Sequence, residues 1–249
     1  MGVLELTVIS VAFFLAAILY SSVGHAGASA YLAVMALAGI APEIMKPSAL
    51  VLNLFVATIG AIQFYRAGHF NWYLLWPFAI TSVPFAFIGG AVKLPGETYK
   101  VLVGLVLVFA AIRLLWQRFM TPRTDSAINP PRLRSSLIAG ALIGGLAGLT
   151  GTGGGIFLTP LLVLTRWADP KGASGISPAF ILVNSLAGLF GTGWNDIKLP
   201  PDFLFWCVAV VAGGTVGSYF GSKRLGSQSM RMLLAVVLLV AGAKLIARV

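Results

Sequence analysis

Residues 148–160 read Gly-Leu-Thr-Gly-Thr-Gly-Gly-Gly-Ile-Phe-Leu-Thr-Pro, a glycine cluster (151–155) between two strongly apolar segments. Each glycine inside a helix costs about 1 kcal/mol relative to alanine, so the cluster disfavours a continuous helix. In hydrocarbon, such a break persists only where protein or a water-filled cavity satisfies the backbone groups. Membrane carriers bind their substrates at broken helices. The stretch therefore predicts a transport site inside a membrane.

The composition of the whole chain places it in a bilayer. Charged residues make up 10% of the sequence, against about 25% in soluble domains, and the mean hydropathy is +0.94. Six runs contain no Asp, Glu, Lys or Arg: residues 6–42, 47–65, 67–92, 135–165, 172–195 and 203–222. Because about 20 apolar residues span the hydrocarbon core, we expect an all-α, polytopic membrane protein. The first segment carries Glu5 and no basic residue, which favours a permanent helix over a cleaved signal.

The chain matches itself when it is shifted by 131 residues. The shift aligns residues that are rare in apolar helices: Pro47 with Pro178, Asn53 with Asn184, Gly60 with Gly191, and Gly90 with Gly221. Upstream, a shift of 127 places Gly24-His25-Ala26-Gly27-Ala28 on the glycine cluster, so the second copy has about four extra residues near 166–175. We therefore predict a first transmembrane repeat over 1–118, a linker over 119–134 and a second repeat over 135–249.

Each copy contains five apolar segments. The predicted segments are 3–23, 27–40, 48–64, 72–92 and 98–118, then 135–150, 154–165, 178–193, 202–222 and 229–247. The second segment of each copy reaches only about 18–22 Å, less than the roughly 30 Å hydrocarbon core. It either spans as a broken helix or enters and returns. If all five cross, the odd number inverts the second copy relative to the first.

The distribution of basic residues helps to choose between spanning and re-entrant short segments, because Lys and Arg concentrate in cytoplasmic loops. With ten crossings, eleven fall on one side: Arg66, Arg113, Arg118, Arg123, Arg132, Arg134, Arg166, Lys171, Lys223, Arg224 and Arg231. Six fall on the other: Lys46, Lys93, Lys100, Lys198, Lys244 and Arg248. With re-entrant short segments the split is nine against eight and gives no orientation. Ten crossings are favoured, in the cell membrane, with the linker cytoplasmic and both termini outside.

Polar groups inside the apolar segments favour an anion as substrate. All seven acidic residues lie at segment ends or in loops, whereas cation carriers usually keep one at membrane depth. Amides, hydroxyls and helix N-termini are suitable donors for an anion. The predicted substrate-binding residues are Gly24, His25, Gly27, Ser48, Asn53, Gly151, Gly153, Gly154, Gly155, Ser177 and Asn184. Ser48 and Ser177 lie beside Pro47 and Pro178, which we take to mark helix starts.

Each of these motifs has a purely structural alternative. The glycine cluster would also suit close helix packing, the asparagines would also bond neighbouring helices, and His25 would also serve as a structural hydrogen-bonding group. One cysteine and two distant histidines give no metal or catalytic set, so we expect no cofactor and no enzyme. The expected partners are a small anion and the lipid bilayer, not nucleic acid, and a homo-oligomer is compatible with the sequence. A passive anion channel is the alternative to a carrier.

Two stretches resemble a known family. Residues 148–162, glycine-rich and carrying Pro160, resemble the signature of the TauE/SafE family of sulfite exporters, and Arg66-Ala67-Gly68-His69-Phe70-Asn71-Trp72 resembles the basic loop after that family's third segment. The duplicated organisation also fits. The resemblance implies a multi-pass carrier of sulfur-containing anions such as sulfite, sulfoacetate or thiosulfate. The first copy departs from the signature, because it lacks the triple glycine and has Ala33 in place of Pro160.

The charge distribution predicts which loops an outside reagent reaches. In a variant lacking Cys207, a cysteine introduced by Lys198→Cys should react with a membrane-impermeant thiol reagent in intact cells. A cysteine introduced by Ser126→Cys, in the linker, should react only after the membrane is opened. Labelling of position 126 in intact cells would reverse the orientation.

Overall fold

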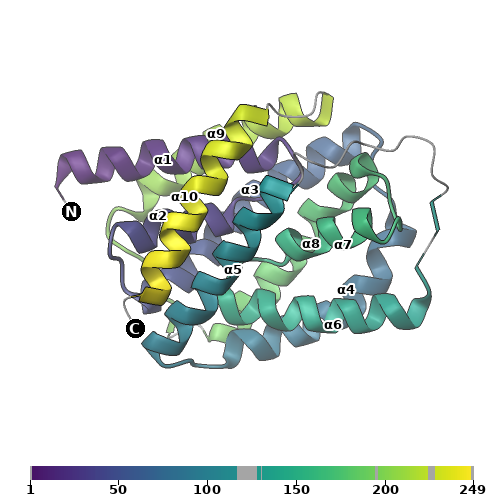
Figure 1. The fold of residues 1–249 in the computed structure, drawn as a ribbon, viewed down its shortest axis with the longest axis horizontal. Helices are drawn as coiled ribbons and strands as arrows, with labels where there is room; N and C mark the ends of the chain where they lie inside the picture. The colour runs from purple at the N-terminus through teal and green to yellow at the C-terminus, as the bar shows by residue number, and fades with distance from the viewer. Residues whose placement is uncertain (1, 117–127, 130, 194–195, 224–227, 248–249) are drawn as a thin grey trace.

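The computed structural model describes residues 2–116, 128–129, 131–193, 196–223 and 228–247. Most of the predicted linker, including Ser126, lies outside these residues. The described part is all-α (Figure 1). Its helices are α1 (Val3–Ser21), α2 (Ala28–Leu37), α3 (Pro42–Arg66), α4 (Trp72–Ala91), α5 (Gly96–Trp116), α6 (Leu133–Thr150), α7 (Gly155–Leu164), α8 (Pro170–Thr192), α9 (Phe203–Lys223) and α10 (Gln228–Ala247). Each predicted apolar segment corresponds to one of them.

Two helices begin more than one helical turn earlier than predicted. α3 begins at Pro42 and α8 at Pro170, because proline is tolerated in the first turn, where its missing N–H would have no helical partner. Asp169 caps α8 by accepting a hydrogen bond from the Gly172 amide at 3.1 Å. Pro47 and Pro178 are therefore inside the helices, and the prediction that they mark helix starts is wrong.

α3 and α8 cross as antiparallel neighbours at the centre of the bundle. Three contacts define the register: Leu50 with Gly188, Asn53 with Ser185, and Gly60 with Pro178. Each step forward along α3 is matched by an equal step backward along α8. In this register Asn53 and Asn184, the matched residues of the two copies, lie within one position of facing each other.

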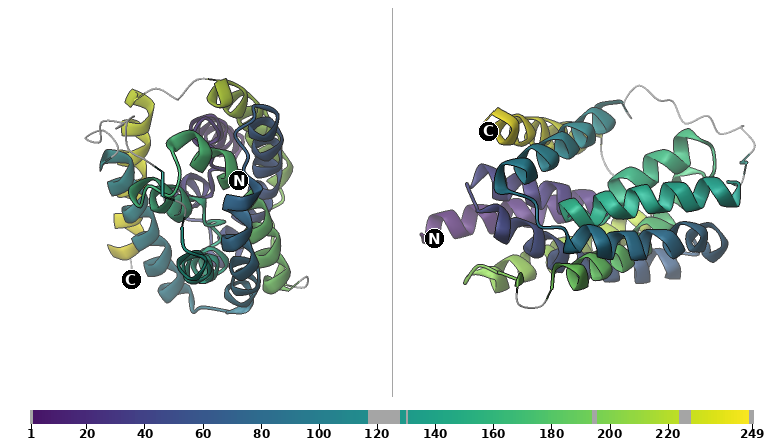
Figure 2. Two further views of the ribbon diagram at one scale, coloured as in Figure 1. Left: turned by 90° about the vertical axis from the view of Figure 1, so that its right-hand side faces the viewer. Right: turned by 90° about the horizontal axis from the view of Figure 1, so that it is seen from below.

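Two further pairs run parallel and are packed through glycines. A Cβ on Gly140, Gly144 or Gly148 of α6 would press on the backbone of Phe78, Ser82 or Ala86 of α4. In the same way Gly213, Gly217 and Gly221 of α9 lie against the backbone of Phe14, Ile18 and Ser22 in the α1 chain. The four-residue spacing puts these glycines on one helix face, where small residues let backbones approach closely. Figures 1 and 2 show α6 running alongside α4.

The last pair, α5 and α10, is antiparallel and packs against the short helix α2 (Figure 1). Gly104 of α5 approaches Gly242 of α10. The Lys244 ammonium of α10 donates to the Leu37 carbonyl at 2.7 Å, which caps the C-terminus of α2. From α5, the Phe109 ring stacks on Phe157 of α7, with ring centroids 5.5 Å apart.

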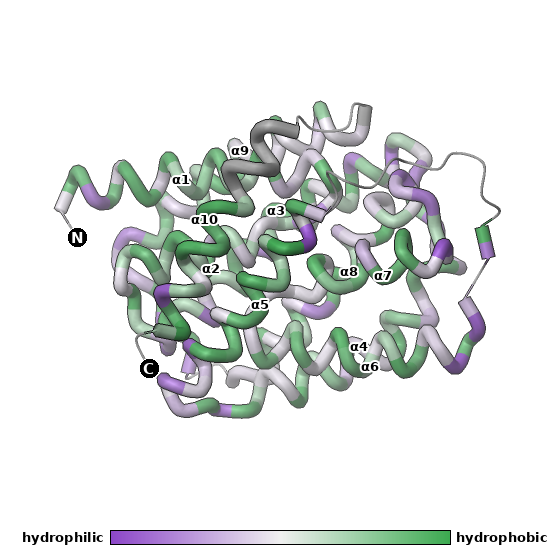
Figure 3. The backbone as a smooth tube through the Cα atoms, viewed as in Figure 1, coloured by the Kyte–Doolittle hydropathy of each residue, from purple (hydrophilic) through white to green (hydrophobic). Residues whose placement is uncertain are grey.

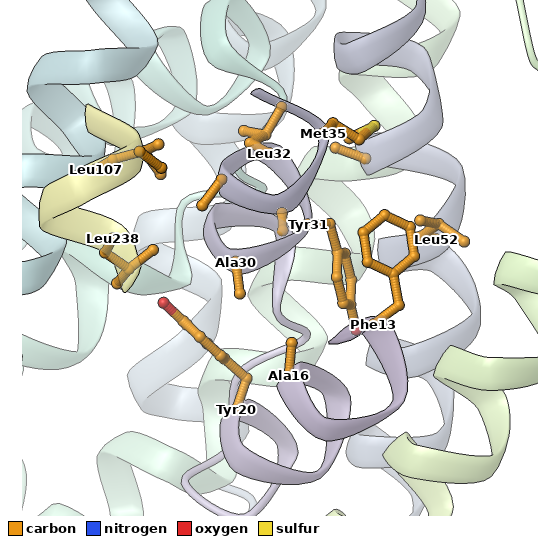
Figure 4. Close-up of a cluster of buried hydrophobic side chains, with 14 of the residues drawn as sticks. Phe13, Ala16, Tyr20, Ala30, Tyr31, Leu32, Met35, Leu52, Leu107 and Leu238 are labelled. Carbon is orange, nitrogen blue, oxygen red and sulfur yellow. The ribbon is translucent and has the colours of Figure 1, made fainter. Parts of the chain in front are cut away.

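Two apolar cores surround the two short helices. The first joins α2 to α1, α3, α5, α9 and α10, and Figure 4 shows its centre around Phe13, Tyr31 and Leu52. The second joins α7 to α4, α6 and α8. Hydrophobic residues extend along the helices and hydrophilic ones gather toward the loops (Figure 3). In the described part six helices, α1, α3, α4, α6, α8 and α9, are long and apolar enough to cross a membrane.

The parallel α4–α6 contact predicts opposite effects for two adjacent glycines. Gly144→Ala adds a methyl group against the Ser82 backbone, so it should lower the free energy of unfolding by about 1–3 kcal/mol. Gly145→Ala meets no atom within 4 Å and should leave stability unchanged, or raise it by up to about 1 kcal/mol. Thermal unfolding of both variants in detergent measures the difference. Equal losses would show that glycine packing does not hold this pair together.

Candidate functional site

Two short breaks interrupt the bundle, between α1 and α2 and between α6 and α7. In the first break Gly24 and Gly27 have φ values of +77° and +103°. In the second, Gly151, Gly153 and Gly154 have φ values of +82°, +72° and +85°. Residues with side chains rarely adopt this left-handed region, so the breaks need glycine. The cluster thus shapes a break in the chain, rather than serving as the face of a continuous helix.

The two breaks meet where α3 and α8 cross. A Cβ on Gly153 would lie 2.7 Å from both Asn53 Nδ2 of α3 and Ser185 Oγ of α8. A Cβ on Gly155 would lie 3.7 Å from His25 Cδ2 of the first break. Residues far apart in sequence are thereby brought to one buried place.

Both short helices start at this place and run to opposite ends of the bundle. α2 ends close to the start of α3 and α7 close to the start of α8, and these starts lie at opposite ends because α3 and α8 are antiparallel. Each short helix has ten residues, about 15 Å, so it covers half of the hydrocarbon thickness. Neither has a side-chain cap at its N-terminus. Two N-termini with free N–H groups and partial positive charge therefore point toward the middle of the bundle.

Side-chain hydrogen bonds hold the first break in place. The Tyr31 hydroxyl donates to the Ala26 carbonyl at 2.7 Å, and the Ser29 hydroxyl donates to the Tyr20 hydroxyl at 2.6 Å. Figure 4 shows both tyrosines within the core, Tyr20 from α1 and Tyr31 from α2. From α8, the Ser174 hydroxyl donates to the Val23 carbonyl at 3.0 Å. These bonds satisfy backbone and hydroxyl groups that the apolar surroundings leave without water.

The second break is held by different residues. The Tyr99 hydroxyl of α5 donates to the Thr150 carbonyl at 3.1 Å, and the hydroxyls of Thr150 and Thr152 lie 2.9 Å apart. Gly151 rests against the Lys46 backbone of α3. The Lys46 ammonium itself donates to the Gly90 carbonyl at 2.8 Å, so it caps α4 and does not turn into the break.

Each of the paired asparagines uses its amide nitrogen in a hydrogen bond and, in the described part of the chain, leaves its amide oxygen without one. Asn53 Nδ2 donates to Ser185 Oγ at 3.2 Å, and Asn184 Nδ2 donates to the Phe180 carbonyl at 2.8 Å. Both residues are 0% exposed, and within the described residues neither Oδ1 has a hydrogen-bond partner. In this arrangement each Oδ1 could accept a hydrogen bond from a ligand, and each Nδ2 retains a second N–H beyond the bond that it makes.

Three further predicted residues, Ser177, Ser48 and Gly154, lie in different surroundings. All eleven are buried. Ser177 ties α8 to α7, since its hydroxyl lies 2.7 Å from Thr159 Oγ1 and donates to the Ala173 carbonyl at 2.8 Å. Ser48 is 0% exposed, and its hydroxyl has no partner within the described residues. A Cβ on Gly154 would meet Ile143 and Phe180, so this glycine faces apolar packing, away from Asn53.

Sequence reasoning missed two residues of the site, Ser185 and Arg113. Arg113 entered the charge count as one of the basic residues on the cytoplasmic side. It lies inside α5, and its Nη1 is 3.2 Å from His25 Nε2. A signal was available, because a charge within an apolar segment is costly and indicates function. The 131-residue shift aligns Arg113 with Lys244, so the two looked like equivalent basic residues of the two copies. Their roles differ, because Lys244 caps α2 and Arg113 contacts His25.

A surface hollow of about 510 Å³ lies at the end of the bundle where α8 begins. Its lining includes His69, Asn71, Asp169 and Lys171, and none of the predicted site residues. In the described part of the chain, no group of three His, Cys, Asp or Glu residues is arranged to hold a metal ion.

The contact between Asn53 and Ser185 should contribute little to stability. Hydrogen bonds between membrane helices average about 0.6 kcal/mol in double-mutant cycles. We expect a coupling energy of about that size from Asn53→Ala, Ser185→Ala and the double variant, measured by unfolding in detergent. A coupling energy above about 2 kcal/mol would make this bond a main support of the α3–α8 crossing instead.

The chain is similar to a known family of membrane proteins. The family described as "Sulfite exporter TauE/SafE" matches residues 9–245. The probable membrane transporter protein y4hK of Sinorhizobium fredii is 40% identical over 96% of this chain and 97% of its own length. The probable membrane transporter protein YjnA of Bacillus subtilis is 26% identical over 90% of this chain and 92% of its own length. No solved structure matches. The chain therefore belongs to the TauE/SafE family and is a multi-pass membrane transporter of the cell membrane.

Proposed function

We propose that this transporter carries a small, sulfur-containing anion by alternating access, and that the anion binds where the two breaks meet. The observation that carries the proposal is the meeting of two uncapped helix N-termini at one buried place. Free N–H groups and the positive ends of two helix dipoles form a site for negative charge. Gly153 and Gly155 lie at the meeting point, where the absence of a side chain would let the backbone approach the anion, whereas Gly24, Gly27 and Gly151 pack on Ser174, Tyr31 and Lys46.

The charges in the described part of the chain support an anion over a cation. Its acidic residues lie in first helical turns, at a cap or in loops: Glu5, Glu43, Glu97, Asp169, Asp196 and Asp202. A desolvated cation would need a compensating carboxylate near the breaks.

The asparagines take a different role in this proposal from the one that the sequence suggested. Asn53 fixes the second break between α3 and α8 through Ser185. The unpaired oxygens of Asn53 and Asn184 would accept from a hydroxyl group or a water that accompanies the anion.

Alternating access is supported by the way the helices pair. α1–α9 and α6–α4 are counterpart pairs, and α3–α8 and α5–α10 each join a helix to its own counterpart. Two inverted copies around a pseudo-two-fold axis would give this arrangement, with the axis near Asn53 and Asn184. Burial of all eleven residues fits an occluded carrier. Rocking of one copy against the other would open the site to each side in turn.

The sulfur-containing substrate class rests on the family, and transport assays test it directly. We expect purified protein in liposomes to take up radiolabelled sulfite, thiosulfate or sulfoacetate in preference to a carboxylate, with mutual competition among the sulfur anions. If none of them is transported, the substrate class is wrong. Saturation at about 1–1000 turnovers per second indicates a carrier. Ohmic single-channel currents would instead identify a passive channel.

Two glycines with the same backbone conformation give a matched test of the site. Gly153→Ala and Gly39→Ala both place a methyl group at positive φ, +72° and +73°, which costs about 1–2 kcal/mol in either case. Only Gly153→Ala presses on Asn53 and Ser185; at Gly39 nothing lies within 4 Å.

We therefore expect at least about tenfold weaker apparent affinity for Gly153→Ala, and near-normal affinity for Gly39→Ala. Uptake is measured in liposomes with equal amounts of folded protein. Equal affinity in the two variants would remove the second break from the anion site.

A further inference from the structure

The surface hollow at the end of the bundle where α8 begins has no role in the anion site described above. Its volume is about 510 Å³, and part of its lining is the loop between α3 and α4, residues 68–73. The rest is the start of α8, with Asp169, Lys171 and Gly172. Asn71 caps α4 and Asp169 caps α8, so both parts of the lining are fixed at helix ends. The hollow is therefore a built feature of this end of the bundle.

The first break lies close behind the hollow. Gly175 of α8 packs on the backbone carbonyl of His69, which belongs to the lining. The preceding residue, Ser174, packs against Gly24 of the first break, and its hydroxyl donates to the Val23 carbonyl at 3.0 Å. Two consecutive residues of α8 therefore stand between the hollow and the first break.

A proline follows this part of α8. Pro178 lies inside the helix and has no N–H, so it offers no helical hydrogen bond to the carbonyl of Ser174. Helices bend at such prolines. Beside it, the Ser177 hydroxyl lies 2.7 Å from Thr159 Oγ1 of α7, which holds this point in place. Residues 170–176 can thus turn about Pro178 while the remainder of α8 stays packed on α3 and α4.

The second break is covered in the same way from the opposite end of the bundle. Gly151, the counterpart of Gly24, rests on the backbone of Lys46 in the first turns of α3. Lys46 is followed by Pro47, the counterpart of Pro178. Each break is therefore covered by the first turns of the other copy's central helix, just before a proline. Two covers at opposite ends suit alternating access, because one can open while the other stays closed.

The end of the bundle with the hollow carries mainly positive charge. Arg66 ends α3, Arg166 lies in the loop before α8, and Lys171 lines the hollow itself. In the described part of the chain the acidic residue at this end is Asp169. The others lie at the starts of α1, α3 and α5 or between α8 and α9, which is the opposite end. A positive surface raises the local concentration of anions.

We propose that the hollow is the mouth through which the transported anion enters or leaves at this end, and that residues 170–176 of α8 are its gate. This inference rests on the proposed anion site. Lys171 attracts the anion into the hollow. The gate then turns about Pro178, which lifts Ser174 and Gly175 from their contacts and opens the first break to the hollow.

Two buried positions of α8 give a matched test of the gate. Ser174 and Ala187 are both 6% exposed and lie on opposite sides of Pro178. Gly175→Ala places a methyl group against the His69 carbonyl and should hold the gate open. In a chain lacking Cys207, it should speed the modification of Ser174→Cys by a water-soluble thiol reagent at least about tenfold. Modification of Ala187→Cys should be unchanged.

The thiol measurement decides the gate without any anion. Equal rates at Ser174→Cys with and without Gly175→Ala overturn the gate. Faster modification at both positions also overturns it, because the variant would then loosen the whole helix. If Gly175→Ala does not fold, Pro178→Ala decides. It restores an N–H donor to the Ser174 carbonyl, so it should slow modification of Ser174→Cys, and an unchanged rate refutes the hinge.

Sulfoacetate uptake tests the mouth. Inside-out and right-side-out membrane vesicles present the two ends of the bundle separately. Lys171→Gln should raise the sulfoacetate concentration for half-maximal uptake at least about twofold from the end with the hollow. The difference should disappear at about 1 M salt, where charges are screened beyond about 3 Å. Lys198→Gln, between α8 and α9 at the other end, is the matched control and should have no effect from this end.

The outcomes separate this inference from the proposed function. An equal effect of Lys171→Gln from both ends, or no effect from either, refutes the hollow as the mouth and leaves the anion site in place. If the wild type transports neither sulfoacetate nor sulfite nor thiosulfate, the proposed substrate class fails. The thiol measurements then still accept or reject the gate.

Discussion

The structure depends on one constraint: two helices stop in the middle of an apolar bundle, and their free backbone groups have to be satisfied without water. Hydrocarbon excludes irregular backbone unless protein or a ligand bonds to it. Here Tyr31 and Ser174 bond to carbonyls of the first break, and Tyr99 bonds to the last carbonyl of α6. The C-terminus of α2 is capped by Lys244. The N-termini of α2 and α7 have no side-chain cap, and this asymmetry favours a ligand that accepts hydrogen bonds.

Close helix contacts make room for these breaks. The parallel pairs α4–α6 and α1–α9 bring backbones together through glycines four residues apart. The crossing of α3 and α8 is different, since it is bonded through Asn53 and Ser185 and includes Pro178 against Gly60. The central crossing therefore determines the position of both breaks, while the glycine-lined pairs surround it.

The two halves share an architecture but differ in chemistry. The second break has glycine at 153–155 and a pair of threonine hydroxyls, so its polar groups are backbone groups and uncharged hydroxyls. The first has His25 and is approached by Arg113. An inverted pair with identical sites would bind two equivalent ligands. Under the proposed function, one anion would bind at the meeting point, and the two breaks would contribute different groups to it.

By itself, the sequence determined the fold class, the approximate ranges of all ten helices and the two breaks. It could do so because hydropathy, segment length and glycine conformation are local properties. The starts of α3 and α8 were misplaced, because a proline within a helix and a proline at its start look alike without the cap at Asp169. Only the tertiary structure decided which groups meet. The hydrogen bond of the Asn53 amide depends on Ser185 of α8, and the contact of Arg113 with His25 depends on the packing of α5 against the first break. These are contacts between residues up to 132 positions apart, and no local pattern specifies them.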